Sequence, residues 1–347
     1  MAQIPESVKK AAHINSLWPF LIYQGKVRDT YDVGRIFPDT LLMLASNRIS
    51  IFDFVLNALV PKKGEVLTAL THFWLTKILN AFPNHLVESK KYQGRNLAFE
   101  MKHDSTGALA ALCDIPLERT LAIKRAQVML WEMVYRHHIG GSVWKEYQKN
   151  GTVAGELLPP GLRKWAKLDA PAFTPTTKSP DGHDEPVTVK EFMERTGFEG
   201  ISAAEILSNI YRIAYNYGDS RGILILDTKF ETDGHMVVDE ALTPDSSRFV
   251  DKADWQEAIN AGREPRFLDK EPVRIWGRGV MTPFRDATGY IMGINNLKTD
   301  DPKHLAFVHS LPVPEKVIAE TTARYLEIFL RLTGMHLEEY QKTYLLL

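Results

Sequence analysis

One segment of the 347-residue chain, residues 222–249, constrains the fold more than any other. It opens with an apolar run, Ile223–Leu226, followed by charges at every second position, namely Asp227, Lys229 and Glu231. The turn dipeptide Asp233-Gly234 comes next, and a second apolar run then ends at Asp239-Glu240. Two such runs around an Asp-Gly turn predict a β-hairpin. On that hairpin Glu231 and Asp239 come within reach of each other, with Lys229 alongside.

Two carboxylates this close repel each other, which predicts a shared cation between Glu231 and Asp239. A small number of oxygen ligands with room left for phosphates fits Mg²⁺ on a nucleotide better than a closed protein site. The alternative is a surface hairpin whose charges are solvated, and the hairpin alone does not decide between the two.

The turn that follows the hairpin, Thr243–Arg248, favours the metal site. It offers two hydroxyl groups at Ser246 and Ser247, several backbone amides and the guanidinium of Arg248. Together these groups form a good receptor for a phosphate monoester. The sequence therefore predicts a phosphate site beside the candidate metal site.

Short strand-like runs occupy much of the N-terminal part of the chain. They predict strands at residues 23–31, 40–45 and 97–102, with an amphipathic helix at residues 65–82. The pattern at residues 120–136 predicts a strand, a hinge and a second strand. This hinge is the expected boundary between two lobes. The lobes are residues 1–126 and residues 127–347.

The C-terminal part mixes helices with strands, which predicts an α+β fold for the whole chain. Apolar residues that recur every three to four positions predict helices at residues 205–217 and 314–332, the second capped by Gly334. Residues 163–184 are rich in proline and threonine and predict a long ordered loop, which inside a domain is often functional.

Composition limits the class of protein. Hydrophobic residues make up 44% of the chain and charged residues 24%, as in an ordinary globular protein. The formal net charge of -1 gives no electrostatic reason to expect nucleic acid or an anionic membrane as a partner. No apolar run approaches membrane-spanning length, and the first residues do not form a signal peptide. With a single cysteine, Cys113, the chain suits a reducing cytoplasm, so we expect a cytoplasmic protein.

Two glycine-containing turns lie beside cations. Gly25-Lys26-Val27-Arg28 can lay backbone amides and two charges over a polyphosphate, although Gly-Lys pairs are also common in solvated turns. No Walker-type motif is present, which disfavours a P-loop fold. The pair Gly140-Gly141 allows a ligand close to the backbone, and the nearby Arg136 suits a carboxylate or a phosphate.

Many blocks of this sequence resemble the signature motifs of the SAICAR synthetase (phosphoribosylaminoimidazole-succinocarboxamide synthase) family. They follow the family's order from about Tyr23 to Phe249. The blocks include Tyr23–Asp32, Ala45–Asp53, Lys63–Thr68, Gly141–Tyr147, Phe173–Lys178, Gly182–Glu185, Asp227–Glu231 and Asp239–Phe249. The resemblance implies a two-lobed fold similar to kinases and ATP-grasp proteins. Its N-terminal lobe is an antiparallel sheet, its C-terminal lobe is larger and α+β, and ATP binds between them.

The resemblance also implies roles for particular residues. ATP binding is expected at Gly25, Lys26, Val27, Arg28, Lys124 and Glu132. Substrate binding is expected at Asn47, Arg136, Ser142, Lys145, His183, Asp184, Asp227, Ser246, Ser247 and Arg248. Catalytic roles are expected for Lys229, Arg136 and Lys178, and metal binding for Glu231 and Asp239. Lys124 is alternatively an exposed lysine at a sheet edge, and His183 alternatively forms a structural hydrogen bond.

The implied reaction is the ATP-dependent joining of L-aspartate to the carboxylate of 5-amino-1-(5-phospho-D-ribosyl)imidazole-4-carboxylate (CAIR). ATP first converts this carboxylate into an acyl phosphate, and the aspartate amine then displaces phosphate to give SAICAR in purine biosynthesis. The expected cofactors are ATP and Mg²⁺. The expected partners are small molecules rather than nucleic acid or membrane, for a monomer or small homo-oligomer.

Two other functions stay open at this point, namely a small-molecule kinase of related fold and a non-catalytic nucleotide-binding homologue. The second is kept open by two departures from the family's usual pattern. Asn47 stands where the family normally has aspartate, and His137-His138 where Gly-Tyr is common. Asn47 either weakens a second metal or caps a turn, a role that asparagine and aspartate fill about equally well.

Overall fold

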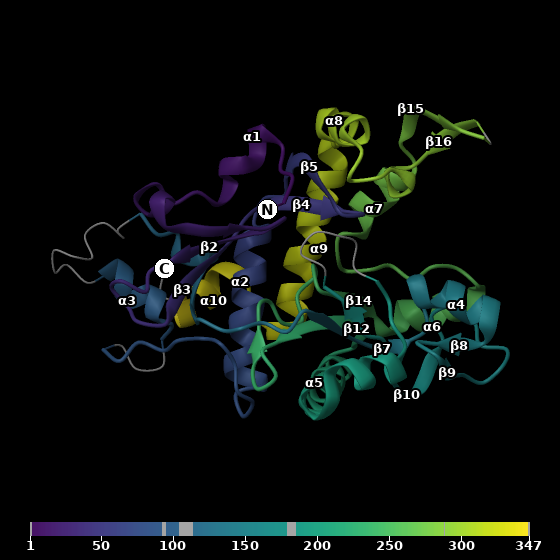
Figure 1. Ribbon diagram of the computed structural model, residues 1–347, viewed down its shortest axis with the longest axis horizontal. Coiled ribbons are helices and arrows are strands. Elements are labelled where there is room, and N and C mark those ends of the chain that lie inside the picture. The colour runs from purple at the N-terminus through teal and green to yellow at the C-terminus, as the bar shows by residue number, and fades with distance from the viewer. Residues whose placement is uncertain (1, 92–94, 104–113, 179–184, 288, 346–347) are drawn as a thin grey trace.

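The computed structural model describes residues 2–91, 95–103, 114–178, 185–287 and 289–345. Cys113, His183 and Asp184 lie outside the described residues. Both large sheets are antiparallel and are combined with helices, so the predicted α+β class is confirmed. Figure 1 shows the N-terminal sheet and the second sheet on different sides of the molecule, with α2 and α9 between them.

The N-terminal sheet has four strands in the order β1-β2-β3-β6. Its strands are β1 (Leu21–Gln24), β2 (Arg28–Asp32), β3 (Thr40–Ala45) and β6 (Thr120–Lys124). The strands predicted at residues 40–45 and at the start of residues 120–136 are therefore present. The run predicted as one strand at residues 23–31 is instead a hairpin. The chain turns there, and the N–H of Gly25 donates to the carbonyl of Arg28 at 2.7 Å.

A smaller hairpin and a buried helix follow β3. The hairpin consists of β4 (Arg48–Ile51) and β5 (Phe54–Leu59), and helix α2 (Lys63–Phe73) continues as a π-helical turn, Trp74–Ile78. The helix predicted at residues 65–82 is present, but it begins at Lys63 and ends at Ile78. Leu67, Leu70 and Trp74 of this helix lie in the main hydrophobic core, and Ile78 packs against it.

Helix α3 (Leu97–His103) replaces the strand predicted at residues 97–102. Asn96 caps this segment, because its Oδ1 accepts a hydrogen bond from the N–H of Ala98 at 3.2 Å. Leu97, Ala98 and Met101 then pack together in one core cluster. The prediction was wrong because a short apolar run fits either element, and the cap and the packed face decide between them.

The second sheet has six strands. Four of them follow the order β10-β7-β12-β13, while β11 also pairs with β7 and β14 with β12. The strands are β7 (Trp131–His138), β10 (Lys167–Phe173), β11 (Thr176–Thr177), β12 (Ile223–Thr232), β13 (Val237–Val238) and β14 (Ser247–Asp251). The pairing of β12 with β13 confirms the predicted hairpin.

The loop predicted at residues 163–184 contains two of these strands, β10 and β11, so that prediction was wrong. The proline-rich composition misled it. Pro171 lies on the edge strand β10, where the register with β7 shifts between Lys167 and Ala172. Edge strands and irregular positions are the places where a sheet tolerates proline.

Long helices pack on the second sheet and join it to α2. Helix α5 (Val189–Ser220), kinked at Gly197, packs below β7 and β12 (Figure 1), where Tyr211 donates to the carbonyl of Ile225 at 2.7 Å. Helices α9 (Glu315–Thr333) and α10 (Leu337–Tyr340) pack against α2. One core cluster therefore includes residues of both sheets. The helices predicted at residues 205–217 and 314–332 are present, and Gly334 caps α9 with a φ of 75°.

The remaining α-helices and β-strands are shorter. They are α1 (Glu6–Lys9), α4 (Ser142–Asn150), β8 (Thr152–Val153), β9 (Glu156–Leu157), α6 (Lys252–Ala261), α7 (Glu271–Arg278), β15 (Met281–Asp286), β16 (Gly289–Met292) and α8 (Pro302–Ser310). Within the described ranges, no helix is both long and apolar enough to cross a membrane. The lobe boundary between residues 126 and 127 falls in the connection from β6 to β7 and stays a prediction.

Candidate active site

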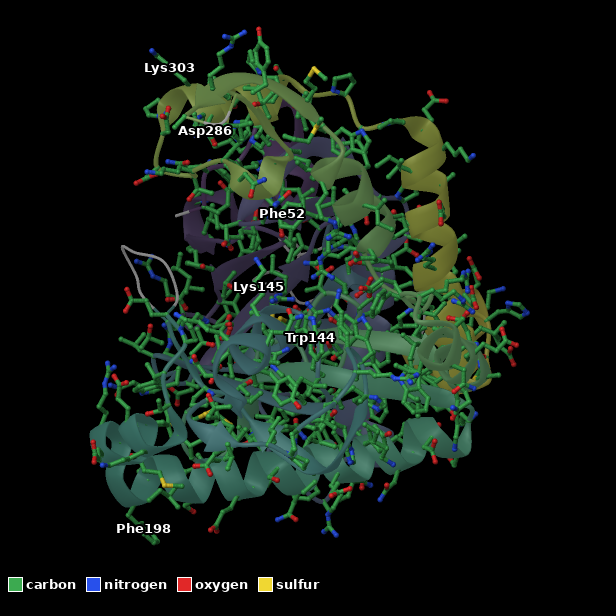
Figure 2. The ribbon with its side chains drawn as sticks, turned by 90° about the vertical axis from the view of Figure 1, so that its right-hand side faces the viewer. Phe52, Trp144, Lys145, Phe198, Asp286 and Lys303 are labelled. Atoms are coloured by element: carbon green, nitrogen blue, oxygen red, sulfur yellow. The ribbon has the colours of Figure 1, made fainter. Side chains whose placement is uncertain are left out.

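A cavity of about 1050 Å³ is lined by side chains from both parts of the chain. Lys26, Phe52 and Asp53 come from the N-terminal part, and further residues come from β7, β12, the turn after β13, and α7. Figure 2 shows Phe52 above Lys145 and Trp144 of α4. The cavity thus lies where elements distant in sequence meet.

Strands β7 and β12 supply charged side chains to this cavity in a regular pattern. They pair antiparallel, with Arg136 opposite Asp227 and Val134 opposite Lys229. Since residues two apart on a strand point to the same face, Asp227 and Lys229 share one face, as do Glu132 and Arg136. All four line the cavity.

Asp227 binds two guanidinium groups at the cavity wall. Arg136 Nη1 lies 2.6 Å from Asp227 Oδ2, and Arg248 Nη1 contacts the same oxygen. Burial alone raises the pKa of Asp227, but Arg248 and Arg136 outweigh it and lower the pKa below the ordinary value. Gly141 packs against this cluster, because a Cβ there would lie 3.1 Å from Arg248 Nη2. The predicted close approach at the glycine pair is thus to an arginine.

The predicted phosphate turn is ordered by its own hydrogen bonds. The N–H of Thr243 donates to Ser246 Oγ at 3.1 Å, and the hydroxyls of Ser247 and Thr228 lie 2.7 Å apart. Ser246, Ser247 and Arg248 all line the cavity. The structure therefore brings these three residues together with Arg136 and Asp227.

Lys229 of β12 is held by an acidic neighbour on β7. Its Nζ lies 2.6 Å from Glu132 Oε1. Burial alone lowers the pKa of Lys229, but Glu132 and Glu231 outweigh it and raise the pKa above the ordinary value. The ammonium group of Lys229 therefore stays charged.

Glu231 and Asp239 meet at the end of the β12–β13 hairpin, where Glu231 pairs with Val238. Burial and then the charge of Asp239 raise the pKa of Glu231. Burial also favours a raised pKa for Asp239, but Arg28, Lys178 and Lys229 lower it. The raised pKa of Glu231 is what the predicted repulsion between two carboxylates produces.

Cations already contact both of these carboxylates. Lys178 forms an ion pair with Glu231, and Arg28 Nη2 lies 2.7 Å from Asp239 Oδ2. Neither carboxylate lines the cavity, and the described residues contain no group of three or more His, Cys, Asp or Glu arranged as a metal site. Two carboxylates still fit Mg²⁺ when phosphates and water supply its other ligands.

The N-terminal loop takes its shape from Arg48. The guanidinium of Arg48 donates to the carbonyls of Gly25 and Lys26 at 3.2 and 3.3 Å. Lys26 lines the cavity, and its Nζ lies 2.5 Å from Asp53 Oδ1. Val27 is buried, and its carbonyl accepts the N–H of Ser46 at 2.8 Å.

Several predicted ligand-binding residues lie outside the cavity lining, namely Gly25, Val27, Arg28, Asn47, Lys124, Ser142, Lys145 and Lys178. Lys124 donates to the carbonyl of Asn84 at 3.2 Å, as the sheet-edge alternative predicts. Ser142 and Lys145 begin α4 directly after Gly141, which does line the cavity.

The two departures from the family pattern have structural roles. Oδ1 of Asn47 accepts the N–H of Gly64 at 2.9 Å, in the first turn of α2, as a capping residue does. His138 lies 3.1 Å from the carbonyl of Trp165 and 3.2 Å from the hydroxyl of Tyr215. Burial lowers the pKa of His138 to about 3 and that of His137 to about 4, so both imidazoles are neutral at pH 7.

Comparisons with known proteins agree on one family. The model of the SAICAR synthetase family matches residues 21–289. The phosphoribosylaminoimidazole-succinocarboxamide synthase of Trichlorobacter lovleyi is 33% identical over 91% of this chain and 95% of that protein. The chain belongs to the SAICAR synthetase family.

Further relatives of this family extend the match to eukaryotes and to a solved structure. The phosphoribosylaminoimidazole-succinocarboxamide synthase of Schizosaccharomyces pombe is 33% identical over 90% of this chain and 94% of that protein. The SAICAR synthase of Saccharomyces cerevisiae, solved in complex with SAICAR, is 30% identical with a TM-score of 0.72 and covers 94% of this chain and 98% of that one. The predicted fold and enzyme class, an ATP-dependent ligase of purine biosynthesis, are confirmed.

Sequence reasoning missed one wall of the SAICAR synthetase cavity. Lys270, Arg274 and Arg278 line it from α7 and its N-cap, and Asp245 lines it from the turn after β13. Asp245 binds Lys63 of α2 at 2.6 Å and the hydroxyl of Tyr325 of α9 at 2.5 Å. The spacing of Lys270, Arg274 and Arg278 could have predicted this wall, since residues four apart share one face of a helix.

Proposed function

We propose that this chain forms SAICAR from CAIR, L-aspartate and ATP in the cavity between β7, β12, the 243–248 turn and α7. One observation carries the assignment of the site to this cavity. Arg136, Asp227, Lys229 and Arg248 converge on it from three separate segments. An anionic nucleotide and a dicarboxylate need such a concentration of fixed cations.

The phosphate of CAIR binds at Ser246, Ser247 and Arg248. Asp227 holds Arg248 and Arg136 in place, so the two guanidinium groups are positioned before the substrate arrives. Preorganised charge of this kind is the main way in which an enzyme stabilises a transition state of acyl or phosphoryl transfer. Ser142, Lys145, Asn47, His183 and Asp184 stay proposed substrate residues on the strength of the resemblance alone.

ATP binds over the N-terminal loop Gly25, Lys26, Val27 and Arg28, with Glu132 and Lys124 nearer the hinge. Lys26 and Glu132 carry this proposal because both line the cavity. Glu231 and Asp239 would hold Mg²⁺, which would neutralise phosphate charge when it is bound. Lys178 and Arg28, which pair with these carboxylates, add positive charge at the same place.

Lys229 stays protonated and contributes positive charge where the γ-phosphate meets the CAIR carboxylate. Its ion pair with Glu132 keeps the ammonium group in place. Arg136 and Lys178 add to the same charge, so the chain's own contribution is positioning and electrostatic stabilisation. We further propose a cytoplasmic enzyme, a monomer or small homo-oligomer, that binds small molecules and no nucleic acid.

The test is release of ADP by the purified protein with CAIR and Mg²⁺, measured with and without L-aspartate, together with detection of the amide product. We expect SAICAR and ADP in equal amounts, and dependence on all three substrates. Steady ADP release without aspartate indicates the kinase alternative, and the absence of any product indicates the non-catalytic one. Either result contradicts the proposal.

A further inference from the structure

Lys270 lines the cavity as the N-cap of α7 and is held more loosely than the other cations that line it. Its Nζ lies 3.8 Å from Asp245 Oδ1, beyond hydrogen-bond distance. Both oxygens of Asp245 already bind other donors, because Lys63 contacts Oδ2 at 2.6 Å and Tyr325 contacts Oδ1 at 2.5 Å. The amine of Lys270 is therefore available to a molecule in the cavity.

The surroundings of Lys270 disfavour its charged form. Burial is the largest cause, and the nearby charges of Arg274 and Lys63 add to it. Asp245 and Glu240 act in the opposite direction, and Asp269 and the hydroxyl of Tyr325 belong to the same buried cluster. The positive end of the α7 dipole also opposes a cation at the N-cap. The result is a pKa lowered to about 8.

The carboxylates that line the described part of the cavity are each bound to a cation. The pairs are Asp53 with Lys26, Glu132 with Lys229, Asp227 with Arg136 and Arg248, Asp245 with Lys63, Glu264 with Lys164, and Glu271 with Arg278. Accepting a proton at any of them breaks or weakens an ion pair. Lys270 accepts a proton without that loss.

The ligase reaction needs a proton acceptor at one step. An amine attacks an acyl phosphate only through its lone pair, whereas L-aspartate reaches the enzyme at neutral pH as an ammonium ion. A general base works best when its own pKa lies near the working pH. This step rests on the proposed function, because it presupposes the acyl phosphate and aspartate in this cavity.

We propose that the neutral amine of Lys270 is the general base that deprotonates the ammonium group of L-aspartate. Lys270 takes one proton and becomes an ammonium ion, and the aspartate nitrogen forms the C–N bond to the acyl carbon. The bond from that carbon to the phosphate oxygen breaks, and its electron pair leaves with phosphate. The second proton of the nitrogen passes to the departing phosphate, and Lys270 returns its proton to water.

Three variants separate a base from a bound cation. Lys270→Met removes both functions, and Lys270→Arg keeps the positive charge but cannot accept a proton. Lys316→Met, on the exposed surface of α9, is the matched control. Each is assayed with CAIR and ATP against two nucleophiles, L-aspartate and hydroxylamine, which is already neutral at pH 7. Thermal unfolding of each variant checks that it is folded.

We expect both Lys270 variants to lose roughly a hundredfold or more in kcat/KM for aspartate, the usual contribution of a general base. Hydroxamate formation stays within a few-fold of the parent, and the control changes neither reaction. A Lys270→Arg variant that keeps its aspartate activity overturns the proposal, because a cation then suffices. Equal loss with both nucleophiles also overturns it, because Lys270 then serves formation of the acyl phosphate.

The parent protein provides a test that needs no variant. Since only neutral Lys270 acts as the base, kcat/KM for aspartate rises with pH through about 8, while the hydroxylamine reaction shows no rise there. The same rise with both nucleophiles contradicts the proposal. Failure of the proposed function is a different result, since the parent then forms no amide with aspartate at any pH.

Discussion

Lys229 and Lys270 are both partly buried lysines that line the same cavity, yet their environments shift their pKa values in opposite directions. Lys229 on β12 has a carboxylate 2.6 Å away, whereas Lys270 lies 3.8 Å from the carboxylate of Asp245, which two other donors already bind. Burial disfavours both charges, but only at Lys229 does a neighbouring acid outweigh it. Burial alone therefore does not determine the protonation state of a lysine, because an ion-pair partner can outweigh it.

The same contrast separates the two walls of the cavity. The β7–β12 wall consists of close ion pairs, such as Arg136 with Asp227, and suits fixed charge for binding anions. The α7 wall contains Lys270, which lies 3.8 Å from its nearest carboxylate, and suits a group that changes its protonation state. We expect substitutions on the first wall to change binding and electrostatic stabilisation, and those on the second to change the pH dependence.

The largest effect is expected from Glu231→Gln, which removes charge from the proposed metal pair and from the surroundings of Lys229. Turnover should fall roughly a hundredfold or more, the usual loss when one group that stabilises transition-state charge is removed. Turnover measured across a Mg²⁺ titration tests this, with Glu338→Gln on the exposed surface of α10 as the control. Near-parental activity at limiting Mg²⁺ rules out the assignment of Glu231.

Arg248→Ala tests the β7–β12 wall at a second point. Arg248 shares Asp227 with Arg136, so its removal leaves the proposed phosphate site short of one charge. Truncating one member of such a charge pair costs about 2–5 kcal/mol. We expect this loss in the KM for CAIR and little change in the KM for ATP. Equal losses for both substrates place Arg248 outside the CAIR site.

Tyr325→Phe should give Lys270 a closer carboxylate partner, as Lys229 already has. The hydroxyl of Tyr325 donates to Asp245 Oδ1 at 2.5 Å, and its loss frees that oxygen for the ammonium of Lys270. The pKa of Lys270 then rises above about 8, so less neutral amine is present at pH 7.5. Activity with aspartate should fall a few-fold at pH 7.5 and recover at higher pH.

The pH profile of kcat/KM for aspartate measures this shift. Tyr290→Phe, at an exposed position on β16, is a control that leaves the profile unchanged. A Tyr325→Phe profile identical to the parent's, in a folded protein, shows that Asp245 does not set the state of Lys270.

The smallest effect is expected from Asn47→Asp. Asn47 bonds the N–H of Gly64 through its side-chain oxygen, and aspartate supplies the same acceptor. Asparagine and aspartate cap helices about equally well, so stability should change by only a few tenths of a kcal/mol. The Mg²⁺ dependence of activity should also be unchanged. A lower Mg²⁺ requirement in the variant assigns position 47 to a metal instead.

Much of the β7–β12 wall was predictable because it is formed by patterns between residues close together in sequence. The alternation of Asp227, Lys229 and Glu231 places three charges on one face of a strand, and the Asp233-Gly234 turn fixes the hairpin. The motif from Asp239 to Phe249 is continuous in sequence, so the resemblance carries it directly. The segment predicted as a strand at residues 97–102 is helical instead, because Asn96 accepts a hydrogen bond from the N–H of Ala98 and because one face packs into a core cluster with residues distant in sequence.

By itself, the sequence determined the family, the α+β class, the hairpin and the residues that carry charge at residues 227–248, because strand period, turn chemistry and continuous motifs are local properties. Only the tertiary structure determined which charged side chains form ion pairs. Arg28 reaches Asp239 across 211 residues of chain, and Lys63 reaches Asp245 across 182. The protonation of Lys270 depends on burial and on partners from α2, α7 and α9 together. Coulomb interactions and desolvation depend on distance in space, which no local pattern records.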